Sequence, residues 1–191
     1  FVSDFYVHLR KEDVILTPTL KTDTDTFFTL LYPYENKSLD QVRSELLSGY
    51  HFKTFWPVTA IRDNAYSKNV IQAAVSLPLG EKDNVWGTLV MNIEDQQIFN
   101  LLKQIEWVNS GSMYIVDDHN QVMLSTTGER TLPAGLNEEL VSGNGYYSYN
   151  AVGVPSMLSY TTGQSGWKYV SLVPESVVLK RVNEVKAWAL T

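Results

Sequence analysis

Two neighbouring stretches bring aromatic side chains together with one arginine, and this combination has the clearest chemical potential in the sequence. Residues 50–57 include Trp56, and Arg62 and Tyr66 follow shortly after. Aromatic rings supply apolar and stacking contacts and a guanidinium is a bidentate donor, so the set suits a small anionic or hydroxylated ligand. The alternative is that Trp56 lies in the core and that Arg62 pairs with Asp63 or with solvent. On these residues alone, the alternative is favoured.

Other reactive side chains lack the partner residues that catalysis or metal binding requires. The three histidines, His8, His51 and His119, lie far apart, and none has the spacing of a metal-binding pair. Ser165 and Lys168 match the S-x-x-K pattern of acyl-transfer enzymes, but glycine flanks the segment and the companion motifs are missing. The sequence therefore predicts no catalytic residue and no metal site.

The sequence also offers no basis for a cofactor. Asp23 and Asp25 begin like a calcium-binding loop, but the glycine of the sixth position and the glutamate of the twelfth are missing. Phosphate-binding and dinucleotide-binding fingerprints are absent from the chain. We therefore expect no cofactor, and we interpret the two aspartates as the start of a helix.

Composition excludes several classes of protein. The 191 residues are 44% hydrophobic, enough for one large domain or two small ones. A net charge of -6 without a basic block argues against nucleic-acid binding. Cysteine is absent, which excludes disulfides and thiolate chemistry and fits an exported bacterial segment. No apolar run approaches the roughly 18 residues that span a bilayer, and no signal peptide is visible, so we interpret the chain as an excised soluble piece.

The local patterns predict mixed α and β structure with antiparallel strands. Aromatic residues, valine and threonine are frequent, and glycine and proline separate short runs. Ser38 and Gln41 have the spacing of a capping box, which predicts a helix over about residues 39–48. A second short helix is expected within residues 22–32. The chain closes in a helix from Pro174, which we expect to continue past the last residue, although a plain C-terminal helix fits nearly as well.

Two patterns occur twice at constant offsets. A hairpin with a charged turn contains Tyr6 in its first copy and Tyr114 in its second, an offset of 108 residues. A strand-to-helix step begins at Gly87 and again at Trp167, an offset of 80 residues. Each unit then consists of a hairpin, a variable middle, two further strands and a closing helix. The alternative is coincidence, because both patterns are common in α+β proteins.

Several of these segments resemble the Cache family of sensor units. Val70–Leu79, a short polar turn and Val85–Ile93 are similar to its late strands, whose usual form is a strand ending in proline, a turn, and G-x-x-x-x-D-I before a helix. Ser112–Gly128 and Ser156–Leu190 resemble a second, smaller unit. Ser165–Pro174 looks like the end of membrane-proximal Cache units in Gram-positive receptors. The resemblance covers nearly the whole chain.

The resemblance implies an α+β fold of two tandem PAS-like (Cache) units, each an antiparallel sheet flanked by helices. Residues 1–108 would form the membrane-distal unit, which is the candidate for ligand binding. Residues 109–191 would form the membrane-proximal unit, whose last helix leads toward a transmembrane segment. Transmembrane helices would flank both units in the intact protein. The long helix that precedes the first strand in the family is missing, which leaves a homodimer and its geometry open.

The resemblance also implies where a ligand would lie. Ligands of the family usually sit in the first unit, between its sheet and the inserted helix and loop. Carried over, Trp56, Arg62 and Tyr66 lie in the loop region that faces such a pocket, and we add Ser76 to these candidates. Asn92 falls where amino-acid-binding members have aspartate, and its neutral amide weakens the expectation of an α-amino acid. The alternative for Asn92 is a helix cap.

We therefore expect an extracellular small-molecule-sensing domain, on the bacterial cell membrane, of a membrane-spanning signal-transduction protein. Its ligand would be a sugar, an organic acid or an amino acid. The resemblance points to an AraC-type transcription regulator or to a histidine kinase of a two-component system, and less to a chemoreceptor. The alternative is a protein-interaction module that recognises a solute-binding protein or another extracellular partner. A third hypothesis is an enzyme, and Ser165 is the only residue that supports it.

Overall fold

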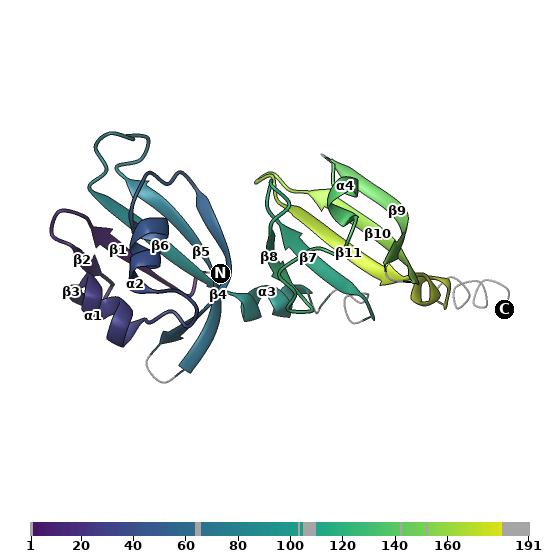
Figure 1. Cartoon of the computed structure of the whole chain (residues 1–191), viewed down its shortest axis with the longest axis horizontal. Coiled ribbons are helices and arrows are strands. Elements are labelled where there is room, and N and C mark those ends of the chain that lie inside the picture. Colours follow the sequence, from purple (N-terminus) through teal and green to yellow (C-terminus); the bar gives the residue numbers. More distant parts are fainter. Residues whose placement is uncertain are drawn as a thin grey trace. The chain divides into compact units, whose positions relative to one another are not determined.

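The computed structural model describes residues 2–63, 66–102, 104, 110–141, 143–151 and 153–180. The chain divides into two compact units, Phe1–Ile98 and Phe99–Thr191. Each unit contains one antiparallel sheet, as Figure 1 shows. The expected α+β class with two sheets in tandem is confirmed. The division falls ten residues before the expected boundary at residue 108.

Six strands form the sheet of unit 1, in the order β3-β2-β1-β6-β5-β4. The strands are β1 (Asp4–Leu9), β2 (Val14–Leu16), β3 (Lys21–Asp23), β4 (Thr54–Asp63), β5 (Tyr66–Leu77) and β6 (Gly87–Glu94). The first and last strands of the unit, β1 and β6, are neighbours near the middle of the sheet. Side chains from the two ends of the unit therefore meet there.

Both expected helices of unit 1 are present, and each continues as a π-helical turn. The first pair is α1 (Thr24–Thr26) and η1 (Phe27–Leu31), and the second is α2 (Leu39–Val42) and η2 (Arg43–Leu47). The Asp23 side chain accepts a hydrogen bond from Thr26 N at 2.8 Å and caps the first helix. Ser38 and Gln41 form the expected capping box. Helix α3 (Asp95–Leu102) follows β6.

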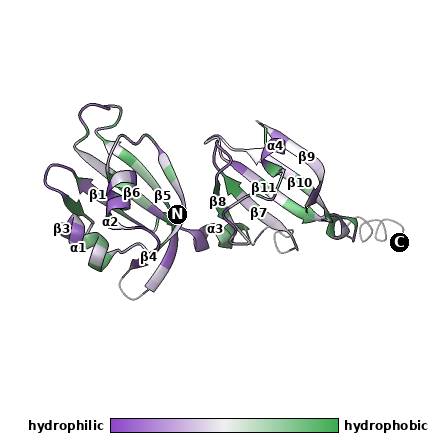
Figure 2. Cartoon of the chain, viewed as in Figure 1, coloured by the Kyte–Doolittle hydropathy of each residue, from purple (hydrophilic) through white to green (hydrophobic). Residues whose placement is uncertain are grey.

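The helical segments between β3 and β4 cover one face of the sheet (Figure 1). Aromatic rings from the two layers pack together there, because the Tyr6 ring centroid lies 5.1 Å from that of Phe27 and 5.7 Å from that of Phe28. Tilted and edge-on arrangements at these distances are favourable. Figure 2 shows hydrophobic residues along the strands and hydrophilic residues on α2. The core of unit 1 therefore lies between its helices and one face of its sheet.

Unit 2 has five strands in the order β8-β7-β11-β10-β9. The elements are β7 (Ser112–Val116), β8 (Val122–Ser125), α4 (Leu136–Glu139), β9 (Asn144–Ala151), β10 (Val154–Thr162) and β11 (Lys168–Pro174). Residues 175–180 are helical, and the rest of the expected C-terminal helix lies outside the described residues. In the described part of the chain, no helix combines the length and hydropathy needed to cross a bilayer.

Strand register confirms the internal repeat. Tyr6 of β1 pairs with Val90 of β6, and Tyr114 of β7 pairs with Val170 of β11. These two pairs differ by the offsets of 108 and 80 residues that the sequence showed. The two hairpins also agree, because Val7 pairs with Leu16 in the first, as the equivalent residues do in the second. The agreement ends at Val116, where the second hairpin has a register shift.

Candidate functional site

A row of polar side chains crosses the centre of the unit 1 sheet. The register pairs Asp4 of β1 with Asn92 of β6, Asn92 with Gln72 of β5, and Gln72 with Trp56 of β4. Asp4 lies two residues before Tyr6, and side chains two residues apart in a strand point to the same face. The row therefore lies on the face that the helices cover.

Hydrogen bonds join Gln72, Asn92 and Asp4 along the row. Gln72 Nε2 donates to Asn92 Oδ1 at 2.9 Å, and Asn92 Nδ2 donates to Asp4 Oδ1 at 2.5 Å. From the helical side, Tyr34 Oη donates to Gln72 Oε1 at 2.8 Å and Tyr32 Oη donates to Asp4 Oδ1 at 2.7 Å. Gln72 and Asn92 are almost fully buried. A buried amide needs such partners, so the network holds both amides in one orientation.

Asp4 at the end of the row is ionised and paired. Lys68 Nζ lies 2.8 Å from Asp4 Oδ2, and it also lies 5.5 Å from the centroid of the Tyr32 ring. Burial raises the pKa of Asp4, but the hydrogen bonds from Lys68, Asn92 and Tyr32 outweigh it and hold that pKa below its usual range. The row therefore ends in a neutralised ion pair.

Replacing this carboxylate predicts a pH-dependent loss of stability. We expect Asp4→Asn to lower the free energy of unfolding at pH 7 by about 1–3 kcal/mol, because the charge-assisted hydrogen bonds are lost. A carboxyl group whose pKa is depressed by folding stabilises above its unfolded pKa, and this stabilisation disappears as the pH falls through the folded pKa. The difference from wild type should therefore shrink between about pH 5 and pH 3, as measured by urea denaturation. Asp83→Asn, in an exposed loop, is the control, and a difference independent of pH would contradict the assignment.

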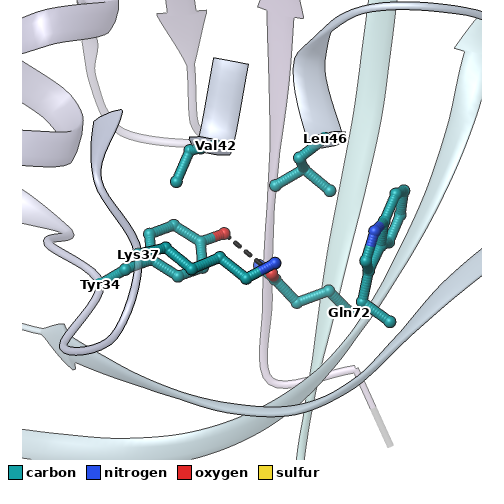
Figure 3. A pocket seen from close by; sticks show the side chains of 6 residues that line it. Tyr34, Lys37, Val42, Leu46 and Gln72 are labelled. Carbon is teal, nitrogen blue, oxygen red and sulfur yellow. Dashed lines mark hydrogen bonds between the residues drawn. The ribbon is translucent and has the colours of Figure 1, made fainter. Parts of the chain in front are cut away.

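A small cavity lies between the polar row and the helical layer (Figure 3). The space between its side chains is too narrow to admit a water-sized sphere. Tyr34 and Gln72 meet in it through their hydrogen bond, and Val42 and Leu46 of the helices close its other side (Figure 3). The cavity is lined by Tyr34, Lys37, Val42, Leu46, Trp56 and Gln72.

An ion-pair network holds the helical layer on the β1–β2 turn. Arg43 of η2 donates to both carboxylate oxygens of Asp13, at 3.0 and 2.8 Å, and to Asp25 at 2.6 Å. His8 Nε2 lies 3.0 Å from Asp13 Oδ1. Burial lowers the pKa of His8 despite the opposing effect of Asp13, so the ring is neutral at pH 7. This network fixes the position of η2 and of its cavity residue Leu46.

The structure brings three of the five expected ligand-binding residues near this cavity or its sheet face. Trp56 lines the cavity and meets the His51 ring edge-on at 5.2 Å between centroids. Asn92 belongs to the polar row, where its amide binds side chains instead of capping a helix. Ser76 is buried on β5, and its Oγ accepts from His51 N at 2.8 Å. Ser76 therefore anchors the segment before β4.

Arg62 and Tyr66 do not reach the cavity. Residues 60–63 continue strand β4, and the β4–β5 pairing sets Arg62 opposite Ser67 at the far end of the hairpin. Arg62 is exposed, and 79% of the Tyr66 surface is accessible. The expectation that this segment is a loop is wrong, because the run from Thr54 to Asp63 is one long strand, although Trp56 of that strand does line the cavity.

Sequence reasoning missed four residues of the site. Gln72 interrupts the apolar run Val70–Leu79, and a lone amide in a buried strand is a signal that could have singled it out. Asp4 could have been found only through its register with Asn92. Tyr34 and Lys37 precede the capping box in a segment without a distinctive pattern.

Unit 2 has leucines at the positions equivalent to the two buried amides. Leu172 of β11 pairs with Ser112 of β7 on one side and with Leu158 of β10 on the other. Leu158 is fully buried and Leu172 nearly so. The three residues are the equivalents of Asp4, Asn92 and Gln72. The buried amides are therefore a property of unit 1 alone and not of the shared fold.

The neighbouring row shows a second difference between the units. Ala74 pairs with Val90 in unit 1, whereas Tyr160 pairs with Val170 in unit 2. Tyr160 is almost completely buried, and a side chain at Gly145 would overlap its ring. A large ring thus fills the position in unit 2 that a methyl group occupies in unit 1.

Among the described residues, three other features were candidates for a second site. Ser165 is exposed, and Lys168 Nζ donates to Asn120 Oδ1 at 2.7 Å, so this lysine is not a base for the serine. Asp117, Asp118 and His119 have potential ligand atoms within 4.8 Å of one another. However, Asp117 Oδ1 accepts from the backbone of His119, so its carboxylate forms the turn. A hollow of about 360 Å³ beside β1 and residues 17–20 is open to solvent.

The two antiparallel sheets in tandem give the chain the fold of double Cache sensor domains. The extracellular domain of rpHK1S-Z16, assigned as a histidine kinase, matches with a TM-score of 0.62 and 14% identity, over 93% of this chain and 73% of that chain. The periplasmic sensory domain of the Campylobacter jejuni chemoreceptor Tlp1 matches with a TM-score of 0.60 and 12% identity, over 94% and 74%.

A third solved structure includes a bound ligand. The ligand-binding domain of the Pseudomonas aeruginosa PAO1 amino acid chemoreceptor PctB, in complex with L-Arg, matches with a TM-score of 0.59 and 11% identity, over 93% of this chain and 73% of that chain. No family model and no curated protein sequence matches the chain. At these identities the similarity defines the fold.

Proposed function

We propose that this chain is the extracellular small-molecule-sensing domain of a membrane-spanning signal-transduction protein, and that its ligand binds in unit 1. The observation that carries the proposal is the contrast between the two units. Burying an amide costs free energy unless all its hydrogen bonds are made. In unit 2, leucines occupy the two equivalent positions, so the fold itself does not require amides there. A polar ligand bound at this face of unit 1 would explain why Gln72 and Asn92 are present there.

The proposed site consists of Trp56, Gln72 and Asn92 on the sheet and of Tyr34 and the helix α2–η2 above it. Arg62 and Tyr66 are left out because they are exposed at the end of the hairpin. Ser76 has a supporting role through His51. A ligand between the layers would change the position of the helical layer and shift a two-state equilibrium of the domain. Such a shift is the form that a signal across a membrane would take.

The output of the intact protein would be an AraC-type transcription regulator or a histidine kinase. The similarity to the extracellular domain of rpHK1S-Z16 supports the second of these. The similar solved structures are sensory domains and not catalytic ones, which supports a binding function rather than an enzyme. The two outputs differ in the gene segment that follows the membrane-proximal unit, so sequencing that segment discriminates between them.

A thermal-shift screen of the purified chain tests the sensing function. We expect a compound among sugars, organic acids and amino acids to raise the melting temperature, because a ligand present at 100 times its Kd stabilises the folded state by about 2.7 kcal/mol. Trp56→Ala should abolish the shift, and Phe52→Ala, at an exposed position on the same segment, should preserve it. If no compound in the library shifts the transition, the closed cavity favours the interaction module instead.

A further inference from the structure

The charges around the unit 1 cavity are arranged asymmetrically. Among the six described residues that line it, Lys37 is the only charged one. Its Nζ lies 2.5 Å from Glu45 Oε2 of η2. The Lys37 side chain is 26% exposed and that of Glu45 is 45% exposed. The cation therefore belongs to the cavity wall, while its counter-ion lies on the solvent side.

A cationic group of a ligand finds no free partner in the same wall. The acid nearest the row, Asp4, is already paired with Lys68 and accepts hydrogen bonds from Tyr32 and Asn92. Asn92 is neutral, and its oxygen already accepts from Gln72. Among the described residues of the row and the cavity wall, no carboxylate remains for an ammonium group.

The neutral polar groups of the cavity suit a ligand oxygen. Gln72 Nε2 has two N–H bonds, of which Asn92 accepts one. Tyr34 Oη donates to Gln72 and can still accept a hydrogen bond. Burial raises the pKa of Tyr34 to about 12, so the hydroxyl keeps its proton at pH 7. A donor and an acceptor thus lie together opposite the apolar walls formed by Val42 and Leu46.

Taken with the proposed function, on which this inference rests, we propose that Lys37 is the anion-binding residue of the cavity. Its ligand is a small carboxylate that carries a hydroxyl or carbonyl oxygen and no ammonium group. On binding, the ligand carboxylate replaces Glu45 as the partner of Lys37. The space between these side chains does not admit a water-sized sphere, so the ligand enters only by displacing the helical layer from the sheet.

The test compares acids with their uncharged and aminated analogues. Wild-type chain is titrated calorimetrically with L-lactate, pyruvate and glycolate, with the amide of each acid, and with L-alanine. We expect at least one acid to bind and its amide and L-alanine to bind at least about tenfold more weakly, because a charge-assisted hydrogen bond is lost. If none of the three acids binds, or if an amide binds as tightly as its acid, the proposal is overturned.

Variants at the two ends of the ion pair should move the affinity in opposite directions. Lys37→Gln should weaken binding of the acid by about 10- to 100-fold, and Lys37→Arg should retain most of it. Glu45→Gln should strengthen binding several-fold, because the ligand no longer competes with the glutamate. Lys11→Gln, at an exposed position, should leave the affinity unchanged. A purely structural role of Lys37 predicts weaker binding in both Lys37→Gln and Glu45→Gln, which would overturn the proposal.

The outcomes separate this inference from the function on which it rests. If sugars or amino acids raise the melting temperature while the three acids do not bind, the carboxylate assignment is wrong and the sensing function stands. If no compound of any class binds, the sensing function itself is wrong. If an acid binds equally to wild type and to Lys37→Gln, the anion-binding residue is misassigned.

Discussion

Asn92→Leu is expected to lower the free energy of unfolding of unit 1 by about 2–4 kcal/mol and to abolish any ligand response. The substitution introduces the residue that unit 2 has at the equivalent position, Leu172. In unit 1, however, it leaves Gln72 Nε2 without its acceptor and removes a donor from the Asp4 carboxylate. Each buried polar group left without a partner costs about 1–3 kcal/mol, and a charged one costs more.

The double variant Asn92→Leu/Gln72→Leu gives the decisive comparison. Gln72→Leu removes the donor that Asn92→Leu leaves without a partner, but it also takes the acceptor from Tyr34 Oη, so the double variant should be as stable as Asn92→Leu to within about 1 kcal/mol. Urea denaturation measures both variants and Gln72→Leu alone, and Asn36→Leu, at an exposed position, is the control. A double variant that loses the sum of the two single losses would show that the amides act separately and not as one network. The ligand response should be absent in both variants.

The repeat and the helix starts were predictable because they depend on local patterns. Tyr6 and Tyr114 were matched by spacing alone, and their equivalent register follows because paired strands preserve an alternation of period two. Ser38 and Gln41 form their capping box within four consecutive residues, so no tertiary information was needed. Features that depend on residues close in sequence, or on a constant offset, were therefore predicted correctly.

The π-helical turns were not predictable from the same patterns. Tyr32 N bonds to Phe27 O at 2.7 Å, and Ser48 N bonds to Arg43 O at 2.9 Å, so each helix ends in a bond that spans five residues. The apolar spacing of Leu39, Val42 and Leu46 is that of an α-helix and gives no sign of the extra residue that a π turn contains.

The site was only partly predictable, because its residues meet across strands and not along the chain. Trp56 and Asn92 were found through their types, but their connection runs through Gln72, which depends on the β4–β5–β6 register. Arg62 was predicted as a ligand-binding residue because of its charge. However, β4 pairs with β5 along its whole length, so Arg62 lies at the end of the hairpin. The cation of the cavity is instead Lys37, which no local pattern distinguishes from other surface lysines.

Filling the cavity should abolish ligand binding while leaving the fold intact. Val42 is 2% exposed and points into the cavity from α2, beside Tyr34 (Figure 3). A larger ring there would occupy the space between the layers, as Tyr160 does in unit 2. We expect Val42→Phe to reduce the affinity of any ligand found for wild type by at least about 100-fold. Overpacking should cost no more than about 1–3 kcal/mol of stability.

The interpretation of Val42→Phe depends on separating blocked binding from a damaged helix. Leu30→Phe adds a similar ring to η1 at a position that is 73% exposed, so it should preserve both stability and binding. Calorimetric titration gives the affinity and urea denaturation gives the stability of each variant. Unchanged binding by a folded Val42→Phe chain would place the ligand outside this cavity, and the open hollow beside β1 would then be the next site to test. Lost binding by a chain that still folds is the result that the difference between Ala74 and Tyr160 leads us to expect.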